Sequence, residues 1–207
     1  RLGGAAPFVM PTAGEVAHFI AACRDAGWKA TAGLHQPLGE WDGERGAFRF
    51  GVTHAGDLLG EVSLPLRGIH NVRNATGALA MAVTIGVPFD AAVAALAKFG
   101  GVARRFDVRG VDAGATLVDD YAHLPSEIAA VLAAARYSGD GWKRVVAVFQ
   151  PNRFNRIVTM WPDYHSASVA ADPVVLTDIP SSGTTPIPGV TGKLPVHAVL
   201  HRPPPPR

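Results

Sequence analysis

Reactive polar side chains stand directly after an apolar run at residues 119–127, DDYAHLPSE. Successive side chains of a strand point to opposite faces, so Asp119 and Asp120 cannot both enter the core. The exposed carboxylate can accept a hydrogen bond from a ribose hydroxyl or orient a nearby base, and Tyr121 and His123 can donate to a phosphate or a carboxylate. An ordinary strand end with a packed tyrosine explains the same residues, and both interpretations stay open at this point.

Two arginines occupy a second polar segment, QPNRFNR at residues 150–156. Arg153 and Arg156 are three positions apart, so they face the same way on an opening helical turn. Guanidinium groups bind carboxylates and phosphates through two parallel hydrogen bonds, and the N-terminus of a helix adds a positive field. We predict an anion clamp here, and two solvated surface arginines are the alternative.

A third segment, HNVRN at residues 70–74, precedes a helical pattern and contains His70, Asn71 and Asn74. A side-chain amide carries both a donor and an acceptor, so it can read the edge of a purine ring. Asn71 is equally suited to be a simple helix N-cap. The two roles are compatible if Asn71 caps the helix and Asn74 binds the ring.

The C-terminal half supplies the elements that would position these side chains. Apolar strands that alternate with helices predict a parallel sheet covered on both faces. Ligands bind at the carboxyl ends of such strands, which is where DDYAH and QPNRFNR lie. The expected strands are 106–111, 115–120, 143–150 and 173–179, and the expected helices are 125–137 and about 157–171.

The N-terminal half shows a different pattern. Residues 47–53 and 60–66 read as two antiparallel strands. Helices are expected at 12–26, from about 73 to 85 and from 88 to 100, because apolar residues recur there at helical spacing. Cys23 lies in the first of them and is interpreted as a small core residue. The pattern breaks near residues 101–103, where we expect a domain boundary.

Composition narrows the functional classes. The 207 residues are 48% hydrophobic and 17% charged, which is typical of a globular protein. A net charge of +2 is too small for a nucleic-acid surface, and no run approaches the ~18 consecutive apolar residues of a membrane span. The single cysteine and the lack of a signal sequence indicate a cytoplasmic setting. No metal-ligand spacing of His and Cys appears, and GVTGKL at 189–194 departs from the phosphate-binding loop pattern.

Five segments occur in an order and at spacings that resemble the Mur ligase family: HNVRNATGALAMA, GVARRFDVRG, LVDDYAHLPSEI, VVAVFQPNRFNR and VVLTDIPSSGTTPIPGV. The resemblance implies an α/β fold. Residues 1–102 would be the end of the central ATP-binding domain, and residues 103–207 a C-terminal Rossmann-like domain with a mostly parallel sheet covered by helices. Because the family's phosphate-binding loop does not occur in these 207 residues, we expect the chain to be an inactive fragment.

The family's chemistry gives the polar segments a common purpose. ATP phosphorylates the lactyl carboxylate of UDP-N-acetylmuramate, and the amine of L-alanine attacks the acyl phosphate to form an amide. The implied partners are these three small molecules, with neither nucleic acid nor membrane. Mg²⁺ is the implied metal, and its ligands are expected in a part of the central domain before Arg1. The alternatives are a relative that adds a preformed peptide to the same sugar and a non-catalytic nucleotide-binding domain with this fold.

The resemblance also implies roles for single residues. ATP contacts are expected from His70, Asn71, Asn74, Arg105 and Asp120. Substrate contacts are expected from Tyr121, His123, Asn152, Arg153 and Arg156, of which His123 and Arg153 are the expected catalytic residues. The family usually has His-His-Pro where this chain has His123-Leu124-Pro125, and Gln-Pro-His-Arg-Tyr where it has Gln150-Pro151-Asn152-Arg153-Phe154. These departures leave the amino-acid specificity open.

Overall fold

The computed structural model describes residues 28–31, 40–137, 141–180, 183 and 185–200. The expected helix at 12–26, with Cys23, and the proline-rich tail at 201–207 lie outside these residues. The chain divides into two compact units: unit 1 holds residues 1–40, 48–64 and 72–99, and unit 2 holds residues 41–47, 65–71 and 100–207. The expected domain boundary near residues 101–103 stays a prediction.

Unit 1 contains an antiparallel sheet. Strand β3 (Ala47–His54) pairs antiparallel with β1 (Trp28–Thr31) and with β4 (Asp57–Leu64), and the short β2 (Glu40–Asp42) belongs to the same sheet. Phe48, Phe50 and Val52 are buried at every second position of β3, as a strand with one covered face requires. The expected antiparallel pair is confirmed.

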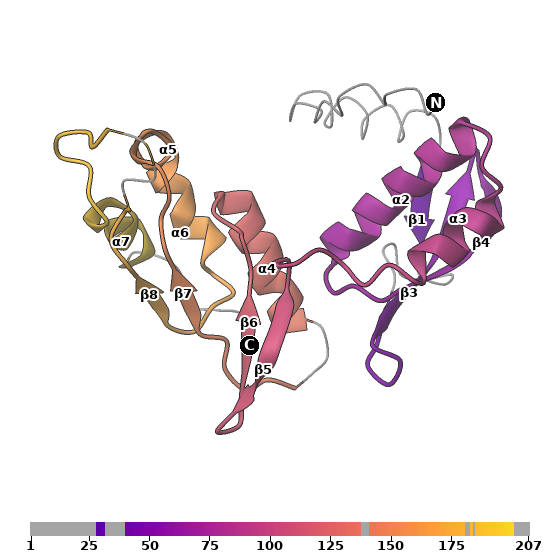
Figure 1. Cartoon of the computed structure of the whole chain (residues 1–207), viewed down its shortest axis with the longest axis horizontal. Helices are drawn as coiled ribbons and strands as arrows, with labels where there is room; N and C mark the ends of the chain where they lie inside the picture. The colour runs from indigo at the N-terminus through magenta and orange to yellow at the C-terminus, as the bar shows by residue number, and fades with distance from the viewer. Residues whose placement is uncertain (1–27, 32–39, 138–140, 181–182, 184, 201–207) are drawn as a thin grey trace, which may run out of the picture. The chain divides into compact units, whose positions relative to one another are not determined.

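Within the described residues, helices α2 (Ile69–Thr84) and α3 (Phe89–Leu96) are drawn on the same side of this sheet in Figure 1. Val72, Ala75 and Leu79 are the buried positions of α2 and lie on one helical face. The helix was predicted to start at about residue 73, but it starts four residues earlier, at Ile69. Asn71 is therefore inside the first turn, and its Nδ2 donates to the Arg67 carbonyl at 2.8 Å instead of its Oδ1 capping the helix.

The described residues of unit 2 form one antiparallel and one parallel pair of strands. Strand β5 (Asp107–Asp112) pairs antiparallel with β6 (Ala115–Asp119), and β7 (Ala147–Phe149) pairs parallel with β8 (Val174–Leu176). The predicted α/β class is confirmed. The expected parallel arrangement holds for β7 and β8, whereas β6 has β5 as its antiparallel partner.

The helices of unit 2 pack beside these strands, as Figure 1 shows for α6 and α7. They are α4 (Pro125–Tyr137), α5 (Phe154–Met160), the 3₁₀ turn η1 (Trp161–Asp163), α6 (Tyr164–Ala167) and α7 (Lys193–Leu200). The single helix expected at 157–171 is wrong, because Pro162 lacks the N–H that a continuous helix would use and interrupts the run between α5 and α6. None of the helices in the described part of the chain has the length and apolar character that crossing a membrane takes.

Two apolar clusters hold unit 2 together. Leu132 of α4 packs with Val145 and Ala171, next to the β7–β8 pair. Phe154, Ile157, Tyr164, Ile179 and Val190 form the second cluster. Ile128 of α4 contacts both clusters, so α4 connects the two halves of the core.

A polar network ties α4 to the segment before β8. The guanidinium of Arg136 donates to the Ala170 carbonyl at 2.9 Å and to Asp172 at 2.8 Å, and Asp172 also accepts from the Val145 N–H. The Val145 N–H and the Arg136 guanidinium hold the pKa of Asp172 below its usual range, although burial acts in the opposite direction.

Candidate active site

The segment after β6 folds around the carboxylate of Asp120. Its Oδ1 accepts from the Ala122 N–H and its Oδ2 from the Phe106 N–H, both at 2.7 Å. The Tyr121 N–H in turn donates to the Arg104 carbonyl at 2.8 Å. Asp120 thus holds the loop at residues 104–106 against the loop at residues 120–123. This backbone role is additional to the ATP contact expected from the sequence, which stays a prediction.

The loop at residues 104–106 is strained around Arg105. Arg104 has φ +59° and Phe106 has φ +48°, a left-handed conformation that non-glycine residues seldom adopt. Such strain persists where the surroundings impose it, and it gathers at functional sites. Here the bonds from Asp120 and Tyr121 impose it, and they leave the half-exposed Arg105 side chain between the two strained residues.

Tyr121 and His123 lie beside these arginines. The Arg104 guanidinium sits 4.8 Å from the centre of the Tyr121 ring, and that of Arg105 sits 6.0 Å away. The His123 ring meets Tyr121 edge-on with centroids 5.3 Å apart, and His123 Nδ1 is 2.8 Å from the Tyr121 carbonyl oxygen. A carbonyl only accepts, so Nδ1 carries a proton in this contact, and whenever the ring is neutral its lone pair is on Nε2.

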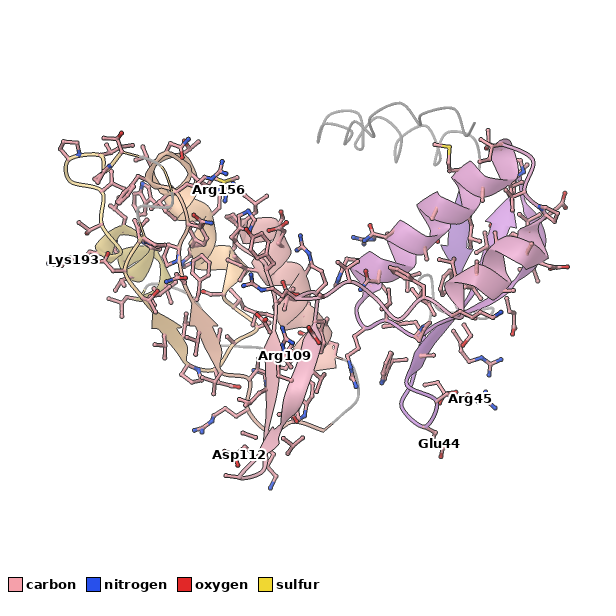
Figure 2. The ribbon with its side chains drawn as sticks, viewed as in Figure 1. Glu44, Arg45, Arg109, Asp112, Arg156 and Lys193 are labelled. Atoms are coloured by element: carbon pink, nitrogen blue, oxygen red, sulfur yellow. The ribbon has the colours of Figure 1, made fainter. Side chains whose placement is uncertain are left out.

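Arg156 of α5 acts by its charge on Tyr164, a residue that contacts this loop. Its positive charge acts on the buried Tyr164 hydroxyl, and that hydroxyl donates to the His123 carbonyl at 3.0 Å. Burial raises the pKa of Tyr164 and the negative charge of Glu127 adds to the rise, while Arg156 opposes it. Figure 2 shows Arg156 on α5 and Arg109 on the β5–β6 hairpin.

Asn152 and Arg153 lie at the entrance of α5. Arg153 has φ +66°, and its exposed side chain has no hydrogen bond or ion pair with any described residue. Asn152 Oδ1 is buried and has no hydrogen-bond partner among the described residues. Of the expected clamp residues, Arg153 lies in this strained turn and Arg156 lies inside α5, and their contact with an amino acid stays a prediction.

The expected adenine contacts all lie in the first two turns of α2. The His70 ring packs over Gly68, where an added Cβ would come within 2.6 Å of it. Asn71 is engaged with the Arg67 carbonyl, and Asn74 is exposed one turn further along. Since residues four apart share a helical face, His70 and Asn74 point to the same side.

Sequence reasoning missed two residues that organise the loop, Glu127 and Tyr164. Glu127 accepts from the N–H groups of His123 and Leu124, at 3.0 and 3.2 Å. Burial raises the pKa of Glu127, but these two N–H donors and the positive charges of His123 and Arg105 outweigh it and lower the pKa overall. A glutamate at the third position of a helix is typical of such a cap, so Glu127 could have been found from the sequence. No sequence pattern predicts the hydrogen bond from the Tyr164 hydroxyl to the His123 carbonyl.

The structure also gathers an aromatic cluster that the sequence did not suggest. The Arg67 guanidinium lies 4.5 Å from the Trp41 ring, 5.6 Å from that of Trp142 and 5.8 Å from that of Phe106. Phe106 and Trp142 are stacked with centroids 6.4 Å apart. Cation–π contacts of this kind anchor the residues just before α2 to the loop that carries Arg105. As for metals, no group of three or more His, Cys, Asp or Glu side chains able to hold an ion occurs among the described residues.

Comparison with known proteins places these loops in a family. The Mur ligase glutamate ligase domain matches residues 104–193, which include every loop of the site except the start of α2. A UDP-N-acetylmuramate–L-alanine ligase of Pelobacter propionicus is 44% identical over 146 residues, and one of Acidothermus cellulolyticus is 45% identical over 144 residues; each match covers 70% of this chain. The chain belongs to the Mur ligase family.

Solved structures share the fold of this chain. The UDP-N-acetylmuramate–alanine ligase of Thermotoga maritima is 28% identical, with a TM-score of 0.60 over 78% of this chain and 34% of that chain. The folylpolyglutamate synthase of Mycobacterium tuberculosis, solved with ADP, shares the fold at a TM-score of 0.61 and 19% identity. This Mur ligase chain spans about a third of the length of the curated relatives it matches, 31% in the Pelobacter case.

Proposed function

We propose that this chain supplies the C-terminal part of an ATP-dependent ligase that joins L-alanine to UDP-N-acetylmuramate, a cytoplasmic step of peptidoglycan synthesis. The observation that carries the proposal is the 44% identity over 146 residues to a protein of that name. The gathering of Arg105, Tyr121 and His123 within one loop system supports it, because the reaction must hold anionic reactants close together.

The reaction has two steps. A lactyl carboxylate oxygen attacks the γ-phosphorus of ATP, the bond from that phosphorus to the β–γ bridging oxygen breaks, and ADP leaves. The alanine amine then attacks the acyl carbon, phosphate is expelled, and the nitrogen loses a proton. Negative charge builds up on the transferred phosphoryl group and on the departing phosphate, so fixed cations lower both barriers.

The proposed residue roles follow from this charge distribution. Arg105 and the α2 residues His70, Asn71 and Asn74 contact ATP, and Asp120 adds a contact while it braces the loop. His123 offers its Nε2 lone pair to the alanine ammonium or amine, since Nδ1 is committed to the Tyr121 carbonyl.

The amino-acid side of the site is assigned to α5. Arg153 and Arg156 bind the alanine carboxylate, with Tyr121 and Asn152 beside it. Mg²⁺, when bound, neutralises the phosphates, and its ligands are proposed to lie outside the residues described here. We also propose that the other domains of the ligase supply the phosphate-binding loop.

The proposal is tested by comparing two amine substrates, L-alanine and a tripeptide. In a full-length ligase that contains this sequence, phosphate release with ATP and UDP-N-acetylmuramate is measured with L-alanine or with a tripeptide as the amine donor. We expect turnover with alanine and a kcat/KM at least tenfold lower with the peptide, a difference of roughly 1.4 kcal/mol in transition-state binding. Preference for the peptide, or no turnover with either, contradicts the proposal.

The same assay tests the proposed binding of the alanine carboxylate by Arg153 and Arg156. Arg156→Ala should raise the KM for alanine far more than the KM for ATP, because the lost guanidinium contacts only the amino acid in this assignment. Arg109→Ala is the control, since Arg109 pairs with Asp107 and Asp119 on the β5–β6 hairpin. Equal changes in both KM values for Arg156→Ala would refute the clamp.

A further inference from the structure

The two oxygens of the Glu127 carboxylate face two different loops. Oε2 accepts from the His123 and Leu124 N–H groups, and Nδ1 of His123 is 3.6 Å from it. Oε1 lies 3.8 Å from Arg105 Nη1. One side chain at the start of α4 therefore contacts both the strained loop at 104–106 and the loop that carries His123.

His123 is held from a second direction as well. Its carbonyl accepts from the Tyr164 hydroxyl at 3.0 Å, so both polar atoms of its backbone have a fixed partner. Tyr164 is only 2% exposed and packs against Phe149 with ring centroids 5.4 Å apart, which leaves its hydroxyl little freedom. Together with the bond from Nδ1 to the Tyr121 carbonyl, three contacts define where the His123 ring lies.

The contact with Arg105 is of a different kind. The 3.8 Å between Arg105 Nη1 and Glu127 Oε1 is too long for a hydrogen bond, so the contact is an attraction between charges. The guanidinium has five N–H donors in total. Glu127 can thus orient Arg105 and still leave most of its donors for a phosphate. A carboxylate bound through two hydrogen bonds would instead compete with that ligand.

We infer that Glu127 is a positioning residue, which fixes the distance between Arg105 and His123, and that Tyr164 assists by holding the His123 peptide. The inference rests on the proposed function in one respect: Arg105 and His123 must serve the same reaction for their spacing to matter. Neither Glu127 nor Tyr164 touches a reactant in this assignment.

The contact itself can be tested without any activity. In the NMR spectrum of the 207-residue chain, the amide protons of His123 and Leu124 should shift together as Glu127 ionises, with a midpoint below the usual glutamate value because the pKa of Glu127 is lowered. Glu127→Gln should abolish this shared titration while the amide of Val145, which reports Asp172, still titrates. Independent behaviour of the two amides, or an unchanged titration in Glu127→Gln, overturns the inference.

The consequence for catalysis is tested in the full-length ligase. Glu127→Ala should lower kcat on the order of ten- to a hundred-fold, since misplacement by about 1 Å costs that much. Tyr164→Phe, which removes only a hydroxyl, should lower kcat less, and Glu127→Asp should recover part of the loss. Asp172→Asn is the control for simple destabilisation of α4, because it breaks the Arg136 network and leaves both loops intact.

The outcomes separate the inference from the proposed function. If Asp172→Asn lowers kcat as much as Glu127→Ala at equal folded fraction, Glu127 is merely structural and the inference fails. If the unmodified ligase does not use alanine, the proposed function fails, while the shared amide titration still shows whether Glu127 joins the loops.

Discussion

At the scale of single residues, Gly68 is the position whose replacement should be most informative. Its φ of +87° is unfavourable for any side chain, and an added Cβ would lie 2.6 Å from the His70 ring and 2.9 Å from Ala134 Cβ. Gly68→Ala should lower the free energy of unfolding by about 2–4 kcal/mol, the sum of backbone strain and overpacking. Urea denaturation followed by circular dichroism measures the loss.

Gly86 provides the matched control for that substitution. Its φ is +90°, but a Cβ added there meets nothing within 4 Å. Gly86→Ala should therefore cost only the strain of about 1–2 kcal/mol. Equal losses at the two glycines would mean that the His70 ring moves aside freely, and His70 would then be too mobile for a defined adenine contact.

The types of the site residues could be predicted from the sequence, but their contact partners could not. The polar character of Asp120, His123 and Arg156 was visible in the sequence, since acids, imidazoles and guanidiniums after apolar strands are easy to recognise. Their partners were not visible. Asp120 bonds to the backbone of Phe106, fourteen positions away, and Tyr164 reaches the His123 carbonyl from forty-one positions away. Such contacts depend on tertiary packing, which local patterns do not encode.

At the scale of elements, Asp172 should control how the stability of unit 2 depends on pH. Its folded pKa is lowered, so its stabilising effect is full above the unfolded value and is lost as the pH falls through the folded one. Asp172→Asn should cost about 1–3 kcal/mol at pH 7, because Arg136 and the Val145 N–H lose a charged acceptor. The gap between variant and wild type should narrow as the pH falls below the usual aspartate range and close once the pH is below the folded pKa, as measured by urea denaturation.

Asp163→Asn is the control for the acid experiment. Asp163 is exposed in η1, and its carboxylate has no hydrogen bond or ion pair with any described residue. Its substitution should change stability by less than about 0.5 kcal/mol at any pH. A gap for Asp172→Asn that stays constant down to pH 3 would show that its ionisation does not stabilise α4.

Elements were predictable where one local signal dominates. The helix at 125–137 was expected within the bounds observed for α4, since Pro125 opens it and an apolar stripe follows. The helix expected at 157–171 failed at Pro162, although proline is a known breaker, because the apolar spacing on both sides suggested one continuous face. The antiparallel β5–β6 pairing followed from the short turn between the strands, at Ala113 and Gly114, which the expectation of a mostly parallel sheet did not take into account.

At the scale of the whole molecule, the proposed reaction needs more than the described loops. The site described here supplies cations, an imidazole and a braced loop, but nothing in the 207-residue sequence matches the glycine-rich pattern that binds the ATP phosphates. ATP bound without that pattern lacks the donors that align its γ-phosphate with the acceptor. The purified chain should therefore release no phosphate in the presence of ATP, Mg²⁺, L-alanine and UDP-N-acetylmuramate, although it is folded by circular dichroism. The full-length ligase at the same molar concentration is the positive control, and phosphate release by the chain that depends on both L-alanine and the sugar nucleotide would show that these loops suffice for the chemistry.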